Sequence, residues 1–356
     1  MLVLSLAVTS VAAGAPSRKM STGHIKQKLI ARTADGGAPN ARASQPTISW
    51  DGRIARYVAY TSAATNIESA TNGRLNVFVV KRKGGGRFGT PWKYGSTKLV
   101  SRGLGGPANG DSSAPSLGGY SSGDRAHSAK CLGFVSRASN LVKKDTNGRA
   151  DVFITRLSGG GLRRIAAPAG TNATDVAVSG NCRVTVIVAN GALYRKRGGG
   201  RLKKIADGGV SSPGLTASGS GVSYSRGGEV YVRRSGGERQ VATGAAPAPD
   251  AGLPQLRWVS FLRGGYAYYK RVGGGTRGIS SASAAHPTAG GAQVFFSRGH
   301  LVYMYAIGNN FGAIRPLGYC PPGQGNVTAL QPSARGNYVA LSCAGGQVYL
   351  SYVGPK

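Results

Sequence analysis

Short apolar runs bounded by glycine recur along the whole chain and determine its secondary structure. Seven of them carry an aromatic residue shortly before a glycine, at Phe78, Phe153, Tyr194, Tyr231, Tyr268, Tyr303 and Tyr349. A second run precedes each aromatic, at residues 56–62, 131–136, 183–189, 221–225, 257–262, 293–297 and 338–342. Such short runs, rich in Val, Tyr and Phe, predict β-strands. Few helices are expected, because no segment keeps a 3.6-residue apolar period.

Two further runs complete a repeating unit. A small-residue segment, often with proline, precedes most of the pairs, and a fourth run follows most of the glycine turns. The fourth runs are residues 98–101, 162–166, 202–206, 238–242, 276–280 and 313–318. The unit therefore has four strands, called a to d in chain order. Four-stranded units repeated seven times predict an all-β fold, a seven-bladed β-propeller, since propellers have about 4 to 8 such blades. Six blades plus an irregular element is the alternative.

The seventh unit lacks a fourth strand, and the start of the chain supplies one. The stretch KLIARTADGGAPNARASQPTIS at 28–49 parallels KLVSRGLGGPANGDSSAPSLG at 98–118. Residues 28–31 are therefore predicted to form the outer strand of blade seven and to close the ring, which removes free sheet edges. Residues 25–356 are expected to form a single domain.

The first two units carry a family resemblance. The stretch QPTISWDGRIARYVAYTS at 45–62 resembles the P-x-x-S-x-D-G-R-x-x-A-x-x-S repeat of TolB-like, WD40-like propellers, known as the PD40 repeat. The stretch NLVKKDTNGRADVF at 140–153 resembles the second half of such a repeat. The resemblance covers about residues 43–166 and implies a propeller with a tight Asp51-Gly52 turn. It implies no particular activity, because propellers carry unrelated functions.

The beginning of the chain and its cysteines indicate export. Residues 1–15 form an apolar run ending in Ala13-Gly14-Ala15, which predicts a signal peptide within residues 1–20. A buried N-terminal segment is the alternative. Four cysteines in an exported protein predict two disulfides, and pairing of near neighbours gives Cys131–Cys182 and Cys320–Cys343. We therefore expect a secreted or cell-envelope protein outside the cytoplasm.

One acidic segment raises the question of a metal. Asp145, Asn147 and Asp151 have a spacing that can place three oxygens around Ca²⁺. A zinc site is not expected, because the sequence has no C-x-x-C pair and only four histidines. The corresponding stretch of blade one has Ala70 and Asn76 in place of the two acids but keeps the Asn-Gly pair. The alternative is an Asn-Gly turn held by local salt bridges.

Charge is the strongest functional signal in the sequence. The chain has 45 Lys and Arg against 12 Asp and Glu, a net charge of +33. The cations concentrate at the c–d hairpins, which all face one rim of a propeller, so we expect this rim to attract polyanions. The predicted contacts are Lys81, Arg82, Lys83, Arg195, Lys196, Arg197, Arg201, Lys203, Lys204, Arg233, Arg234, Lys270 and Arg271. The alternatives are protection of sheet edges and a generally basic composition.

Two functions from different classes follow. The first is a secreted, monomeric, non-catalytic binding module for an anionic polysaccharide, a cell-wall polymer, an anionic lipid surface or a protein partner. Export argues against a specific nucleic-acid target. The second is an enzyme acting on a saccharide or peptide at the centre of the ring. The sequence has no G-x-S-x-G motif, and His286 and His300, which share one blade, have no acid or nucleophile in sequence context, so we assign no catalytic residues.

Overall fold

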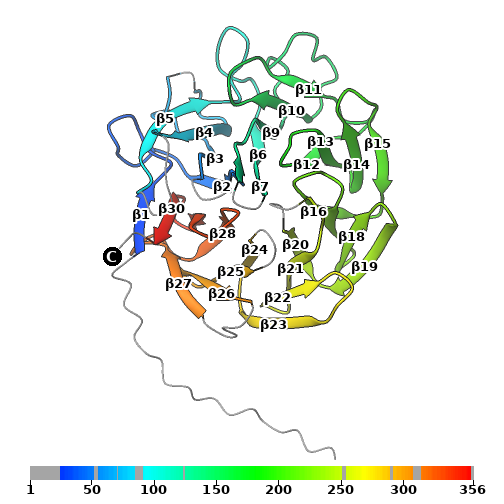
Figure 1. Cartoon of the computed structure of the whole chain (residues 1–356). Helices are drawn as coiled ribbons and strands as arrows, with labels where there is room; N and C mark the ends of the chain where they lie inside the picture. The colour runs from blue at the N-terminus through cyan, green and yellow to red at the C-terminus, as the bar shows by residue number, and fades with distance from the viewer. Residues whose placement is uncertain are drawn as a thin grey trace, which may run out of the picture.

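The computed structural model describes residues 25–51, 55–69, 71–84, 91–122, 125–250, 254–288, 292–307 and 314–353. Seven antiparallel four-stranded sheets stand around a common centre (Figure 1), and these residues contain no α-helix. The seven-bladed β-propeller is thereby confirmed, and the six-bladed alternative is wrong. No helix long and apolar enough to cross a bilayer occurs in the ranges given. The predicted signal peptide lies outside them.

Each blade runs from an inner strand a to an outer strand d. Blade one contains β2 (Ala43–Ile48), β3 (Tyr57–Ser62), β4 (Asn76–Arg82) and β5 (Tyr94–Leu99). Blade two contains β6 (Ser112–Leu117), β9 (Cys131–Ser136), β10 (Asp151–Arg156) and β11 (Arg163–Ile165). Blade three contains β12 (Ala173–Val178), β13 (Val184–Ala189), β14 (Ala192–Arg197) and β15 (Lys203–Ala206).

The remaining blades follow the same order. Blade four contains β16 (Val210–Leu215), β17 (Val222–Arg226), β18 (Glu229–Arg234) and β19 (Gly237–Thr243). Blade five contains β20 (Ala245–Pro249), β21 (Trp258–Arg263), β22 (Tyr266–Arg271) and β23 (Thr276–Ser281). Blade six contains β24 (Ala284–Pro287), β25 (Gln293–Arg298), β26 (Leu301–Ala306) and β27 (Ile314–Tyr319). Blade seven contains β28 (Val327–Pro332), β29 (Tyr338–Cys343), β30 (Val348–Val353) and β1 (Ile25–Leu29).

The two ends of the described chain close the ring. Strand β1 pairs antiparallel with β30, from Ile25 opposite Val353 to Leu29 opposite Tyr349. In Figure 1 the blue strand lies beside the red one. The predicted closure is confirmed, although the strand begins three residues before the predicted 28–31. Past its end, the Ile30 N–H still donates to the Val348 carbonyl at 2.9 Å.

Blade two has an insertion that the repeat did not predict. A short hairpin, β7 (Tyr120–Ser122) and β8 (Arg125–His127), interrupts the connection from β6 to β9. It lengthens the a–b connection of this blade without disturbing the pairing of β6 with β9.

The hydrophobic core is a set of layers between neighbouring blades. One layer joins Ile48 and Tyr60 of blade one to Ala340 and Leu350 of blade seven. Strands covered on both faces read as unbroken apolar runs, which is why the b strands were recognisable. The aromatic landmark of strand c faces an aromatic of strand b in five blades. The pairs are Tyr60–Phe78, Phe134–Phe153, Tyr224–Tyr231, Phe261–Tyr268 and Phe296–Tyr303, with ring centroids 5.5 to 5.7 Å apart.

Four inner strands share a proline bulge. In each, the residue before the proline has a positive φ of 48 to 51°, and the register with strand b shifts there. Proline has no N–H to contribute to a ladder, so a bulge is where a strand tolerates it. The residue pairs are Gln45-Pro46, Ala114-Pro115, Ser212-Pro213 and Ala246-Pro247. All four prolines line the central channel.

Candidate functional site

The a–b turns are held by one recurring hydrogen bond. In five blades a hydroxyl at the end of strand a accepts the N–H of a residue at the start of strand b, at 2.9 to 3.2 Å. These hydroxyls belong to Ser49, Ser179, Thr216, Thr288 and Ser333. In blade five a carboxylate takes the same place, since Asp250 accepts the Arg257 N–H at 3.3 Å. Asp250 is fully buried, and burial raises its pKa to about 7.

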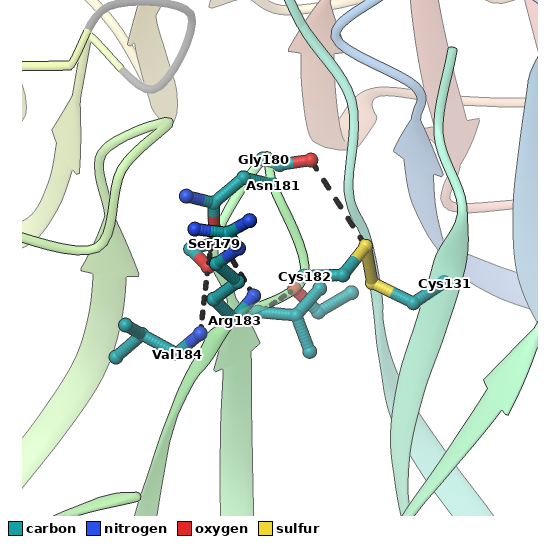
Figure 2. The surroundings of a disulfide bond; sticks show 9 residues. Cys131, Ser179, Gly180, Asn181, Cys182, Arg183 and Val184 are labelled. Atoms are coloured by element: carbon teal, nitrogen blue, oxygen red, sulfur yellow. Dashed lines mark hydrogen bonds between the residues drawn. A yellow bond between two sulfur atoms is a disulfide. The ribbon is translucent and has the colours of Figure 1, made fainter. Parts of the chain in front are cut away.

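The predicted Asp-Gly turn of blade one has a counterpart in blade three. Asp51 accepts the Ser49 hydroxyl at 2.9 Å and the Arg56 N–H at 3.1 Å. Asn181 likewise accepts the Ser179 hydroxyl at 2.8 Å and the Arg183 N–H at 3.0 Å. Cys182 then stands where Gly52 stands in the sequence of blade one, with a φ of 62°. Figure 2 shows this turn and its link to Cys131.

Both predicted disulfides are confirmed. Cys131 at the start of β9 bonds to Cys182, with the Cα atoms 6.0 Å apart. Because Cys182 lies in the turn and not in strand b, it reaches the neighbouring blade. Cys320 follows β27 and bonds to Cys343 at the end of β29, with a Cα separation of 5.7 Å. Each disulfide therefore joins two adjacent blades, two to three and six to seven.

The a–b and c–d turns lie on one face of the ring, because successive strands of a blade alternate in direction. On this turn face a cavity of about 980 Å³ opens between blades one, two and three. Four cationic side chains line it, from Arg56, Lys130, Arg156 and Arg163, and none of its described lining residues is acidic. We call it the basic cavity. Arg56 and Lys130 come from a–b turns, Arg156 ends β10 and Arg163 begins β11.

Few acidic side chains lie close enough to neutralise the cations of the basic cavity. Lys130, Arg156 and Arg163 are exposed. Arg56 has its Nε 3.9 Å from the buried Oδ2 of Asp51, and its side chain is 40% exposed. At that separation and exposure the pairing is weak, because solvent screens it. The cavity therefore presents a concentrated positive potential to solvent.

Glycine turns and a disulfide complete the walls. Gly159 to Gly161 of blade two and Gly198 and Gly199 of blade three line the cavity, and a Cβ at any of them would meet no atom within 4 Å. Cys131 and Cys182 also line it, so the disulfide fixes the blade-two wall relative to the blade-three wall.

The predicted rim residues fall into three groups. Eight are exposed: Lys81, Lys83, Arg197, Arg201, Lys203, Lys204, Arg234 and Arg271. Four are half-buried: Arg195, Lys196, Arg233 and Lys270. The expected surface role of Arg82 is wrong, because this residue is only 3% exposed. Alternation along β4 turns Arg82 inward beside Lys81, where its Nη1 donates to the Tyr338 hydroxyl at 3.3 Å.

Part of the rim charge on blades three and four is already paired. Lys204 contacts Asp207 at 2.7 Å, and Arg233 donates to the Ile205 carbonyl at 2.9 Å. Burial lowers the pKa of Arg195, and the positive charges of Arg197 and Arg233 lower it further. These side chains are therefore partly engaged within the protein, whereas the cations of the basic cavity are not paired in this way among the described residues. The role of the rim side chains in polyanion binding stays a prediction.

The predicted Ca²⁺ ligands surround a guanidinium group. Arg164 lies 3.0 Å from Asp145 through Nη2 and 2.5 Å from Asp151 through Nε, while the Asn147 amide donates to Asp151. Burial raises the pKa of Asp145, and Arg164 opposes that effect. The side-chain oxygen Oδ1 of Asn147 accepts the Arg149 N–H at 3.0 Å, which is the hydrogen bond expected of an asparagine in a turn. A cation would have to displace Arg164, and Ca²⁺ binding stays a prediction.

The central channel is the candidate site for the alternative function. It is a cavity of about 450 Å³ lined by the inner strands of all seven blades, mainly with small and apolar residues. Its described lining includes two titratable groups, Asp175 of blade three and His286 of blade six. Burial raises the pKa of Asp175 to about 6 and lowers that of His286 to about 4. The His286 ring lies 5.2 Å from that of Trp50.

None of the four basic-cavity cations is among the predicted rim contacts. Arg156 and Arg163 flank a c–d turn, where cations were expected to concentrate, whereas Arg56 and Lys130 come from a–b turns on the same face. A count of Lys and Arg over both kinds of turn would have included them.

Neither the protein-family models nor the curated proteins show a match to this chain. The resemblance of residues 43–166 to TolB-like PD40 repeats therefore stays a prediction.

Proposed function

We propose that this propeller is a non-catalytic binding module for an anionic polymer or surface, which it contacts through its turn face. The observation that carries the proposal is the basic cavity, where four cations and no acid line one hollow. The net charge of +33 adds a long-range attraction toward any polyanion. The eight exposed rim cations extend the positive surface outward over the blades.

The proposed ligands follow from the proposed location. Two disulfides are typical of proteins that fold in an oxidising compartment, which supports a secreted or cell-envelope location. The anionic polymers available there are acidic polysaccharides, cell-wall polymers and the headgroup surface of anionic lipids. We propose these as the ligand classes, bound by a monomer on a TolB-like scaffold.

The test is the binding of the purified protein to immobilised polyanions over a range of salt concentrations. Neutralised charges release counterions, so affinity should fall steeply with salt. Replacing Arg56, Lys130, Arg156 and Arg163 by Gln should weaken binding and flatten this dependence. The matched control replaces four exposed cations of the opposite face, Arg74, Arg102, Arg137 and Lys143, by Gln. Equal losses from both variants would mean that only net charge matters, and no binding to any polyanion would overturn the proposal.

A second candidate is an enzyme that acts on a saccharide or peptide in the central channel. The half-buried carboxyl of Asp175 favours it, because a pKa of about 6 suits general acid or base catalysis near neutral pH. Hydrolysis assays with saccharide and peptide substrates, run on the native protein and on Asp175→Asn, test this candidate. Activity that disappears with Asp175→Asn and survives in the basic-cavity variant would favour the enzyme over the binding module.

A further inference from the structure

The four cations of the basic cavity come from three elements of two neighbouring blades and converge on one hollow. Arg56 is in the a–b turn of blade one, Lys130 is in the a–b turn of blade two, and Arg156 and Arg163 flank the c–d turn of blade two. A cavity of about 980 Å³ is of the size that holds a small ligand or a short polymer segment, on the order of 300–1,000 Å³. A ligand that neutralises all four cations must therefore carry several negative charges.

The types of donor in this cavity match a tetrahedral anion. Three of the four cations are arginines, whose planar forks donate two parallel hydrogen bonds to a pair of anionic oxygens. The hydroxyls of Ser128 and Ser158 line the same wall and can donate in other directions. A phosphate group offers oxygens in three dimensions, so forks and hydroxyls can bind it together. A carboxylate offers two oxygens in one plane and uses fewer of these donors.

The c–d turn of blade two offers backbone donors at Gly160 and Gly161, while the Gly159 N–H already donates to the Arg156 carbonyl at 3.3 Å. Gly159, Gly160 and Gly161 are exposed, and the space where their side chains would lie is open. Gly159 and Gly160 have φ values of 112 and 125°, a conformation that residues with a Cβ rarely adopt. Turns of this kind bring backbone N–H groups close to phosphate oxygens, because no side chain intervenes.

We propose that the basic cavity is a phosphate-binding site, which takes a segment carrying two or more phosphate groups. This assignment rests on the proposed function, since it names the class of anion for the same cavity. The recognised chemistry is the phosphate group itself, on a phosphodiester backbone or on phosphomonoester substituents. The disulfide between Cys131 and Cys182 fixes the two walls of this cavity relative to each other.

The experiment is calorimetric titration of the full chain with tripolyphosphate and, separately, with citrate, a tricarboxylate. At one fixed ionic strength we expect tripolyphosphate to bind at least about tenfold more tightly, the equivalent of one charge-assisted hydrogen bond. Arg156→Gln with Arg163→Gln should weaken tripolyphosphate binding by about tenfold or more. The matched control, Arg74→Gln with Arg137→Gln, should change it less than about twofold. Lys130→Glu is a second cavity variant, and thermal melting verifies that all three are folded.

Citrate binding as tight as tripolyphosphate, or cavity variants with native tripolyphosphate affinity, would overturn the phosphate assignment. If tripolyphosphate fails while immobilised polyanions still bind through the cavity cations, the phosphate assignment falls and the proposed function stands. If neither binds, both are wrong. Comparison of glycerophosphate diesters with sugar phosphomonoesters then distinguishes the two sources of phosphate.

Discussion

The Nε of Arg164 donates to the Oδ2 of Asp151 at 2.5 Å, and the carboxylate is fully buried. The same carboxylate accepts the Ala167 N–H at 2.7 Å, and Arg164 also reaches Asp145. One guanidinium on strand d therefore balances two acids of blade two, Asp151 at the start of strand c and Asp145 in the b–c connection. Removing it would leave two buried carboxylates without their counter-charge.

We predict that Arg164→Gln lowers the free energy of unfolding by about 3–5 kcal/mol, the usual cost of breaking a buried ion pair from one side. Urea denaturation at pH 7 measures it. The control is Arg163→Gln, because Arg163 is the exposed neighbour on the same strand and should change stability by less than about 0.5 kcal/mol. Equal effects of the two substitutions would contradict the structural role of Arg164.

The same site decides the question of Ca²⁺. Binding at Asp145, Asn147 and Asp151 requires Arg164 to leave, so the two cations compete for the same oxygens. The Ca²⁺ hypothesis predicts a higher melting temperature in Ca²⁺ than in EDTA. The ion pair alone predicts the same melting temperature in both. The variant Arg164→Gln should show a larger Ca²⁺ response than the native protein, because the competitor is gone.

Asp250 should make the protein less stable as pH rises. Burial raises its pKa from an ordinary 3.8 to about 7, so the folded state favours the protonated form. The stabilisation is complete below about pH 4 and is lost as pH rises to about 7, by at most about 4 kcal/mol. Asp250→Ser restores the hydroxyl that the other a–b turns use. We expect it to stabilise the protein at pH 8 but not at pH 4.

Thermal or urea unfolding of native protein and Asp250→Ser at several pH values measures this difference. Exposed Asp207, whose pKa is lowered by the Lys204 side chain, is the control. Asp207→Asn should not reproduce the gain at high pH. If the stability of the native protein and that of Asp250→Ser changed with pH in parallel, burial would not raise the pKa of the Asp250 carboxyl.

The proline bulges predict an unusual effect of glycine. Ala246 has a φ of 48°, whereas its exposed neighbour Ala245 lies in the same strand and has no positive φ. Ala246→Gly should be neutral or stabilise the protein by up to about 1 kcal/mol, because the Cβ strain disappears. Ala245→Gly should cost about 0.5–1 kcal/mol. The order of the two melting temperatures is the measurement, and a reversed order would count against the bulge.

Ring closure gives a prediction about truncation. Deleting residues 1–33 removes β1 and the buried Ile30 and Ala31, so blade seven loses its outer strand and β30 becomes an unpaired edge. We expect a large fall in melting temperature and a tendency to aggregate. Deleting residues 1–20 leaves β1 in place and should leave the melting temperature unchanged. Identical melting of the two truncations would refute the closure.

The blades could be predicted because each strand has its own local pattern, repeated seven times. The aromatic of strand c and the apolar run of strand b survive even where turn residues differ, since both serve the layers between blades. The hairpin of β7 and β8 was missed because it occurs in one blade only, so no repeat reveals it. The positive φ of Ala114 could not be predicted from the sequence, because a residue before proline ordinarily takes an extended conformation.

The site was only partly predictable, for geometric reasons. Lys81 and Arg82 are neighbours in a basic run, but alternation along a strand sends one to solvent and the other into the core. Charge counting cannot separate them without the register. Arg56 and Arg156 lie far apart in the sequence, and only the packing of blade one against blade two brings them to one cavity. The pairing of Arg164 with Asp145 and Asp151 likewise depends on which strand lies beside which.

The pairing of β1 with β30 also fixes an order of events during biosynthesis. Strand β1 is made more than 300 residues before its partner. Blades one to six each take all four strands from one continuous stretch of chain, interrupted only by the β7–β8 hairpin in blade two, so each can assemble while translation continues. Blade seven must wait until β30 has left the ribosome, and β1 stays an uncovered strand until then. A chaperone that shields an extended N-terminal segment during this interval would therefore be expected to raise the yield of the folded ring.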